Sequence, residues 1–168
     1  NIYAYSLSKD NDSYTQRVKN AVYCFREVSL LSDDEIVNIV RKDKIDIAID
    51  LNGLTKLNRR NIFNHRLAPK QINYLGYPGT MGSKSFDYII ADKIAIPEEN
   101  RKFYTEKVLY LPNSFLPNDD TKQISPRKFR KEDLGLPTNG FIFTCFNHTN
   151  KITRKEFNIW MNLLQKVK

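Results

Sequence analysis

Short apolar runs that are typical of buried strands alternate along this chain with segments that have helix caps and helical apolar spacing. Strands are predicted over 2–7, 25–30, 45–51, 72–75, 86–91, 107–111 and 141–146. Helices are predicted from Ser13, after Ser32 and after Thr153, with a weaker one over 58–63. Alternation of this kind indicates βαβ units. The predicted fold class is therefore α/β, with a mainly parallel sheet and flanking helices.

Capping boxes locate the helix starts. Ser13 with Gln16, Ser32 with Glu35, and Thr153 with Glu156 each have the spacing at which a side chain closes the first turn. Apolar residues then follow on one face of each helix. The predicted faces comprise Tyr14, Val18, Ala21 and Val22, then Ile36, Val37, Ile39 and Val40, then Phe157, Trp160, Met161 and Leu164.

The strand and helix pattern occurs twice, and a proline-rich stretch separates the two occurrences. Residues 112–136 hold Pro112, Pro117 and Pro126 and show no periodicity. We expect residues 1–111 to form one α/β unit and residues 112–140 to form a connector. Residues 141–168 then supply the first strand and helix of a second unit.

Composition excludes several classes of protein. The chain has 168 residues, of which 40% are hydrophobic, which is enough for a core. It has no apolar run near the roughly 20 residues of a membrane helix, and its first residues do not read as a signal peptide. Cys24 and Cys145 lie far apart, which favours two core thiols, a reducing compartment and a cytoplasmic location. Two histidines leave little for a metal site, so none is predicted.

A formal charge of +8 permits an anionic partner. The positive residues are spread along the chain, and only Lys122–Lys131 forms a basic cluster. We favour the interpretation that these positive residues form an ordinary solvated surface. The alternative is a non-catalytic basic module that binds nucleic acid or acidic proteins, which requires these charges to share one face.

The loop between Phe146 and Thr153 is the first candidate site. In open α/β sheets, ligands bind beyond the carboxyl ends of strands, where helix N-termini favour phosphate. Lys151 adds a full charge there, Asn147 and His148 add donors, and Thr153 caps the helix. These residues fit a diphosphate site, and an ordinary loop with a surface lysine fits equally well.

Two further loops follow predicted strands. In residues 50–56, Gly53 permits a tight turn while Asn52 and Thr55 offer polar groups to a cleft. Residues 75–82 contain three glycines and a proline, which lets the backbone approach a ligand closely. The alternative for Gly53 is a helix C-cap or an ordinary turn glycine. Residues 75–82 match neither a Walker nor a GxGxxG motif, and a two-turn loop is the alternative there.

The exact order of residues in these segments is more specific than their composition. The series DIAIDLNGLTK from Asp46, RLAPKQ from Arg66, LGYPGT from Leu75 and DYIIAD from Asp87 resembles the catalytic region of the protein O-linked N-acetylglucosamine transferases. That family also contains the SPINDLY proteins. Later segments agree, including Leu134–Pro137 and the run CFN over residues 145–147, which ends four residues before Lys151.

The resemblance implies two Rossmann-like halves of the GT-B type that face each other across a nucleotide-sugar cleft. It implies an inverting transfer of N-acetylglucosamine from UDP-GlcNAc to Ser or Thr hydroxyls of an acceptor protein or peptide, without metal or other cofactor. It also implies a tetratricopeptide array before this region in the intact protein.

The resemblance assigns roles residue by residue. Lys151 stands where the family has its donor-phosphate lysine, and His148 takes the place of a nucleotide contact that is Gln in animal enzymes. Leu75, Gly76 and Pro78, in a run that continues to Thr80, match the loop that meets sugar and acceptor. Arg59 matches a cleft arginine.

Two departures limit the expected activity. Cys24 stands where the family usually has His, and we expect the segment with the catalytic histidine to lie upstream of Asn1. We therefore expect no transferase activity from this chain alone, and some self-association through uncovered apolar surface. A fucosyltransferase of the SPINDLY type, which uses GDP-fucose, is the enzymatic alternative.

Overall fold

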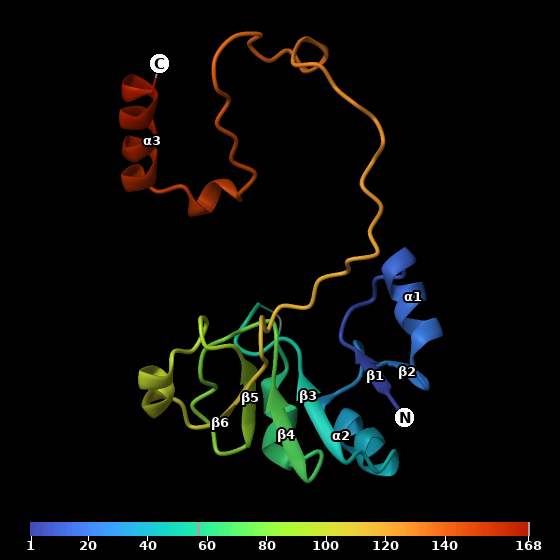
Figure 1. Ribbon diagram of the computed structural model, residues 1–168. Helices are drawn as coiled ribbons and strands as arrows, with labels where there is room; N and C mark the ends of the chain where they lie inside the picture. The colour runs from blue at the N-terminus through green and yellow to red at the C-terminus, as the bar shows by residue number, and fades with distance from the viewer. Residues whose placement is uncertain (57, 168) are drawn as a thin grey trace. The chain divides into compact units, whose positions relative to one another are not determined.

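The computed structural model describes residues 1–56 and 58–167. The chain divides into two compact units, Asn1–Asn118 and Asp119–Lys168. The first unit contains all the strands of the described residues and both hydrophobic clusters, whereas the second contains short 3₁₀ turns and one long helix (Figure 1).

Two parallel sheets confirm the α/β class. Strands β1 (Tyr3–Ser6) and β2 (Cys24–Glu27) form a pair, and α1 (Ser13–Ala21) connects them. A second sheet has the order β3 (Ile47–Asp50), β4 (Lys70–Asn73), β5 (Tyr88–Ala91) and β6 (Lys107–Tyr110), and all its strands run parallel. Its carboxyl ends therefore share one edge.

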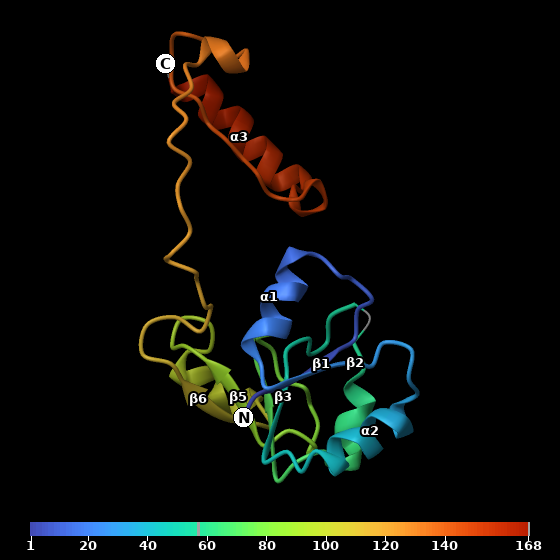
Figure 2. The same cartoon turned by 90° about the vertical axis from the view of Figure 1, so that its right-hand side faces the viewer.

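The inner face of the four-stranded sheet carries the core. Helix α2 (Asp33–Lys42) lies beside the 3₁₀ helix η1 (Arg60–His65) at this sheet (Figure 2). The predicted stripe of α2 is confirmed, because Ile36, Val37 and Val40 are buried against Phe63 of η1 and Ala48 of β3. Side chains alternate along each strand, so Ile47, Ile49 and Leu109 point from the opposite face, where they are exposed.

Two of the three predicted capping boxes form. Ser32 pairs with Glu35 and Thr153 with Glu156, the latter at the start of α3 (Arg154–Lys166). The box predicted at Ser13 is wrong. Asp12 caps α1 instead, and its carboxylate accepts from the Thr15 N–H at 2.8 Å. A carboxylate one residue earlier reaches the same free N–H groups and also carries the charge that a helix N-terminus favours.

The strand predicted over 141–146 does not form. A strand needs a neighbour for its backbone N–H and C=O groups, and the described residues of the second unit provide no other strand. Cys145 is consequently exposed, so the prediction of a core thiol is wrong there, and Cys24 is only half-buried. The apolar face of α3 is also uncovered within this unit, since Phe157 and Leu164 are exposed.

The weaker helix predicted over 58–63 is the 3₁₀ helix η1, displaced by two residues, and a further 3₁₀ helix, η2 (Glu98–Phe103), was not predicted. In the second unit, η3 (Glu132–Leu134) and η4 (Thr149–Lys151) are single turns. The segment that follows β6 remains attached to the first unit, because Phe115 N–H donates to Asp92 at 2.8 Å and Tyr74 Oη donates to Phe115 O at 2.9 Å.

A polar network holds the amino ends of β4 and β5 to η1. Arg66 has a φ of 53° and donates to both carboxylate oxygens of Asp87 at 2.7 Å. Gln71 is fully buried, and its amide donates to Phe63 O and Ser85 O. The Arg66 guanidinium, followed by the Gln71 N–H, lowers the pKa of Asp87 below its ordinary value.

We predict that Asp87→Asn costs about 2 kcal/mol of unfolding free energy at pH 7, because it removes a charged acceptor of three hydrogen bonds. A depressed pKa in the folded state stabilises above the unfolded value near 3.9 and is lost as the pH falls through the folded value. Urea unfolding from pH 7 to pH 2.5 should therefore show a steeper loss in the parent chain than in Asp87→Asn. The exposed-site control Asp46→Asn should keep the steeper loss, and equal slopes for the parent and Asp87→Asn would contradict the assignment.

Candidate functional site

Two loops leave the carboxyl edge of the four-stranded sheet side by side. Strands β3 and β4 are in register, so that Asp50 pairs with Asn73 at their last residues. The loops that follow, residues 51–56 and 74–82, include two of the three segments that the sequence indicates as candidate sites. This edge is where open α/β sheets bind ligands.

The two loops touch through backbone at glycine. A Cβ on Gly76 would lie 2.3 Å from Leu51 O and 2.9 Å from Asn52 O, so no side chain fits there. A Cβ on Gly53 would lie 2.7 Å from the Cβ of Tyr77. Leu75 takes a positive φ of 76°, which places the following residue against the first loop. The structure thus brings Asn52, Leu75 and Gly76 together.

Asn73 holds the second loop from beneath. Its Nδ2 donates to Tyr77 O at 3.0 Å and to Gly79 O at 3.3 Å, although the residue itself is fully buried. These two carbonyls fix the orientation of the amide. Its Oδ1 and the Oδ2 of Asp50 are buried without a partner among the described residues. Both unsatisfied acceptors lie at the junction of the two loops.

Glu106 and Tyr104 hold the same loop from the β6 side. Glu106 is buried, and its carboxylate accepts from Met81 N–H at 2.6 Å and from Thr80 Oγ1 at 2.7 Å. Tyr104 Oη donates to Pro78 O at 3.0 Å. Burial raises the pKa of Tyr104, which keeps this hydroxyl protonated as a donor.

Asn73, Tyr104 and Glu106 were not singled out from the sequence. Tyr104 and Glu106 lie 26 and 25 residues from the atoms they bind, so no local spacing marks them. The one signal in the sequence was a polar residue within an otherwise apolar segment, such as Asn73 at the end of β4.

The other residues of the first unit that were predicted for the site differ in which polar groups they leave without a hydrogen-bond partner. The Thr80 hydroxyl is engaged by Glu106, and Pro78 is exposed above the loop. Asn52 uses its backbone N–H and C=O within its own loop, while its side-chain amide has no partner among the described residues. Arg59 donates to Asp33 and to Leu31 O, so its guanidinium is tied to the start of α2.

The third candidate loop belongs to the second unit and is described by itself. His148 precedes η4, and its carbonyl accepts from Lys151 N–H at 2.9 Å. Asn147, His148, Lys151 and Thr153 are exposed, and the Lys151 ammonium has no partner among the described residues. Lys151 is the one Lys or Arg residue within 147–153, and the exposed Arg154 and Lys155 follow at the start of α3.

The described residues contain neither a cluster of metal-ligating side chains nor a membrane-spanning helix. No three His, Cys, Asp or Glu side chains within residues 1–56 and 58–167 are grouped so that they could hold a metal ion. Within those ranges no helix has the length and apolar character needed to cross a bilayer.

We predict that Gly76→Ala destabilises the first unit by about 3 kcal/mol, because the added methyl must displace the Leu51 carbonyl. Gly82→Ala is the matched control. Gly82 has a φ of 60° with open space around its Cβ, so the methyl adds only backbone strain of about 1 kcal/mol. Chemical denaturation measures both, and a smaller loss for Gly76→Ala than for Gly82→Ala would refute the backbone contact.

We predict that Glu106→Gln loosens the second loop, since an amide of the same shape replaces the charged acceptor of Met81 N–H and Thr80. The expected loss is about 2 kcal/mol, with faster hydrogen exchange at the Met81 amide. Glu98→Gln, which removes an exposed ion pair with Arg101, should change stability by less than about 0.5 kcal/mol. Unchanged exchange at Met81 would show that Glu106 does not hold the loop.

Comparison with known proteins identifies the family of this fold and these loops. Residues 1–131 match the sequence model of Glycosyl transferase family 41. The chain is 38% identical over 172 aligned positions to the probable UDP-N-acetylglucosamine–peptide N-acetylglucosaminyltransferase SEC of Arabidopsis thaliana, covering 99% of this chain and 18% of that protein. It is 32% identical to the similarly named SPINDLY protein of Petunia hybrida, covering 95% of this chain and 17% of that one.

A solved structure agrees with these sequence matches. A mutant of the Thermobaculum terrenum O-GlcNAc transferase superposes with a TM-score of 0.81 at 29% identity, over 98% of this chain and 30% of that chain. The chain thus spans less than a fifth of the length of the curated relatives, and its parallel α/β fold is that of the O-GlcNAc transferase catalytic region. On the match over residues 1–131, this chain belongs to glycosyl transferase family 41.

Proposed function

We propose that this chain forms part of a catalytic region that transfers N-acetylglucosamine from UDP-GlcNAc to Ser or Thr hydroxyls of a protein acceptor, with inversion at the sugar. The observation that carries the proposal is the locked pair of loops at the carboxyl edge of the sheet, within a region that matches family 41.

The loop over residues 75–80 is proposed to meet the sugar and the acceptor. Its carbonyls at Tyr77, Pro78 and Gly79 are all engaged by protein donors, so its path is fixed before any ligand arrives. A preformed surface lowers the entropy lost on binding and keeps the reacting groups in line. The unpaired side-chain amide of Asn52 supplies a polar contact beside it.

Lys151 is proposed to stabilise the departing diphosphate. When a hydroxyl attacks the anomeric carbon, negative charge accumulates on the leaving phosphate, and an ammonium group there favours the transition state over the ground state. Asn147, His148 and Thr153 would contact the same donor. The Lys151 ammonium is uncommitted and therefore available for this role.

The isolated chain is proposed to be inactive as a transferase. It spans 18% of its SEC relative and 30% of the T. terrenum chain, so most of the length of those proteins has no counterpart in these 168 residues. The division into residues 1–111, a connector over 112–140 and the start of a second half over 141–168 is part of the same proposal.

We predict that the 168-residue chain binds UDP weakly and that Lys151→Ala reduces the affinity about tenfold or more, the usual loss for one charge-assisted hydrogen bond. Lys155→Ala, which removes an equal exposed charge from the next turn, should change the affinity less than twofold. Titration followed by NMR measures both, and similar losses for the two variants would refute the phosphate role of Lys151.

A transferase assay with an acceptor peptide tests the remainder of the proposal. The chain should show no turnover with UDP-GlcNAc, and appreciable turnover would contradict its proposed incompleteness. GDP should bind no more tightly than UDP. Tighter binding of GDP would favour a fucose donor over N-acetylglucosamine.

A further inference from the structure

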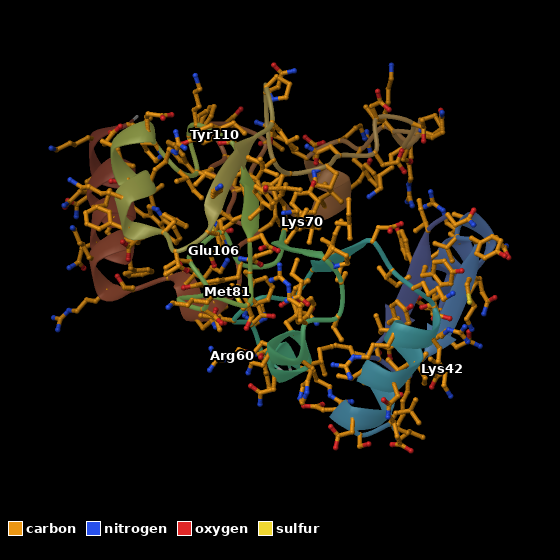
Figure 3. All side chains as sticks on the ribbon, turned by 90° about the horizontal axis from the view of Figure 1, so that it is seen from below. Lys42, Arg60, Lys70, Met81, Glu106 and Tyr110 are labelled. Carbon is orange, nitrogen blue, oxygen red and sulfur yellow. The ribbon has the colours of Figure 1, made fainter. Side chains whose placement is uncertain are left out.

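A pocket of about 230 Å³ opens where the second loop ends, between η1 and the segment that leads into β5. Its polar lining comes from Arg60, Asn61 and Asn64 on one side and Ser83 on the other, and the buried side chains of Met81 and Phe86 form its floor. Figure 3 shows Arg60 and Met81 on the same side of the first unit. Met81 and Gly82, at the end of the second loop, line the pocket, whereas the residues assigned above to donor, sugar or acceptor do not.

Arg60 is distinguished by what its guanidinium does not touch. The other arginines of residues 1–118 have partners: Arg26 with Asp43, Arg59 with Asp33, Arg66 with Asp87, Arg101 with Glu98, Arg41 with His65 O, and Arg17 over the Tyr14 ring. The Arg60 side chain has no hydrogen-bond or ion-pair partner among the described residues. A planar fork of donors thus belongs to an exposed residue of the pocket lining and has no protein partner there.

The rest of the lining also offers more donors than acceptors. Asn64 Oδ1 accepts from Ser85 Oγ at 2.9 Å, which leaves the Asn64 amino group available. The Ser83 hydroxyl accepts from Ser85 N–H at 3.1 Å and can still donate its own proton. The Asn61 amide has no side-chain partner among the described residues. No carboxylate lines the pocket.

We propose that this pocket binds the carboxylate of a Glu or Asp side chain on the acceptor polypeptide. One guanidinium with neutral amide donors matches a single negative charge, and guanidinium and carboxylate pair through two parallel hydrogen bonds. The apolar floor suits the short methylene stem that carries such a group. A phosphate dianion would call for a second positive group, and the lining has none.

The position of the pocket points to the acceptor as the source of that carboxylate. Met81 and Ser83 directly continue the loop that the proposed function assigns to sugar and acceptor, which places the pocket beside that loop. This part of the inference rests on the proposed function. The pocket would thereby select acidic residues near the modified hydroxyl.

The test is an NMR titration of the 168-residue chain with a blocked tetraglutamate peptide, following Arg60 Nε–H and the side-chain amides of Asn61 and Asn64. A tetraglutamine peptide and inorganic phosphate are titrated in parallel. We expect saturable shifts of these signals with tetraglutamate, binding at least tenfold weaker with tetraglutamine, and weaker binding of phosphate. Equal affinity for tetraglutamine, or tighter binding of phosphate, would overturn the assignment.

Two matched pairs of variants separate the pocket from general charge attraction. Arg60→Gln should weaken tetraglutamate binding about tenfold or more, whereas Lys84→Gln, an equal charge change outside the pocket, should weaken it less than twofold. Asn61→Asp should likewise weaken it, while Asn38→Asp on an exposed position of α2 should not.

Equal effects within either pair would overturn the proposal, provided that amide spectra show each variant to be folded. Because none of these titrations uses UDP, they are independent of Lys151. Failure of the pocket and failure of the donor site can therefore be told apart.

Discussion

The close approach of Gly76 to the Leu51 carbonyl is the constraint on which the candidate site depends. Two loops from neighbouring parallel strands can share one surface only if one backbone comes within contact distance of the other, and here a side chain at Gly76 would prevent it. The positive φ of Leu75 directs the chain into that contact. Asn73 and Glu106 then fix the loop from below and from the β6 side.

This arrangement explains why polar residues occupy the inner face of the sheet at both ends. At the amino end, Gln71 connects η1 to the entry of β5, and Glu106, which directly precedes β6, holds Thr80 and Met81. At the carboxyl end, Asn73 holds the carbonyls of Tyr77 and Gly79. Apolar packing on the same face comes from Ile89 and Val108, which lie level with Asn73 on the neighbouring strands β5 and β6. Buried hydrogen bonds are directional, so they define the loop path in a way that apolar contacts alone do not.

Local signals in the sequence were sufficient for part of the fold. The Ser32 and Glu35 box predicted the start of α2 because both partners lie within one turn. At α1 the same rule failed by one residue, since Asp12 competes for the same N–H groups. The strand predicted over 141–146 shows the opposite limit. Its alternating apolar residues are real, but a strand exists only with a neighbour, and that information is not local.

The same limit applied to the site. The glycines and proline of residues 75–82 marked a loop of unusual backbone, and the family resemblance gave it a role. The residues that hold it, Tyr104 and Glu106, belong to a later segment that only the register of β5 and β6 brings alongside. Positioning residues are therefore harder to find from sequence than the loops they position, because their partners lie far away in the sequence and most of them are backbone atoms.

Arg59 and Arg60 illustrate how two adjacent residues of one type acquire different roles. Arg59 fills its donors with Asp33 and Leu31 O, which joins the segment after the first loop to the start of α2. Any contribution it makes to a cleft is thereby coupled to the position of that helix. Arg60 begins η1 one residue later and lines the pocket. Its guanidinium has no partner among the described residues, so its charge remains available. A basic composition alone cannot distinguish these roles. What distinguishes them is whether the fold supplies a carboxylate within reach, and at Arg60 it supplies a pocket instead.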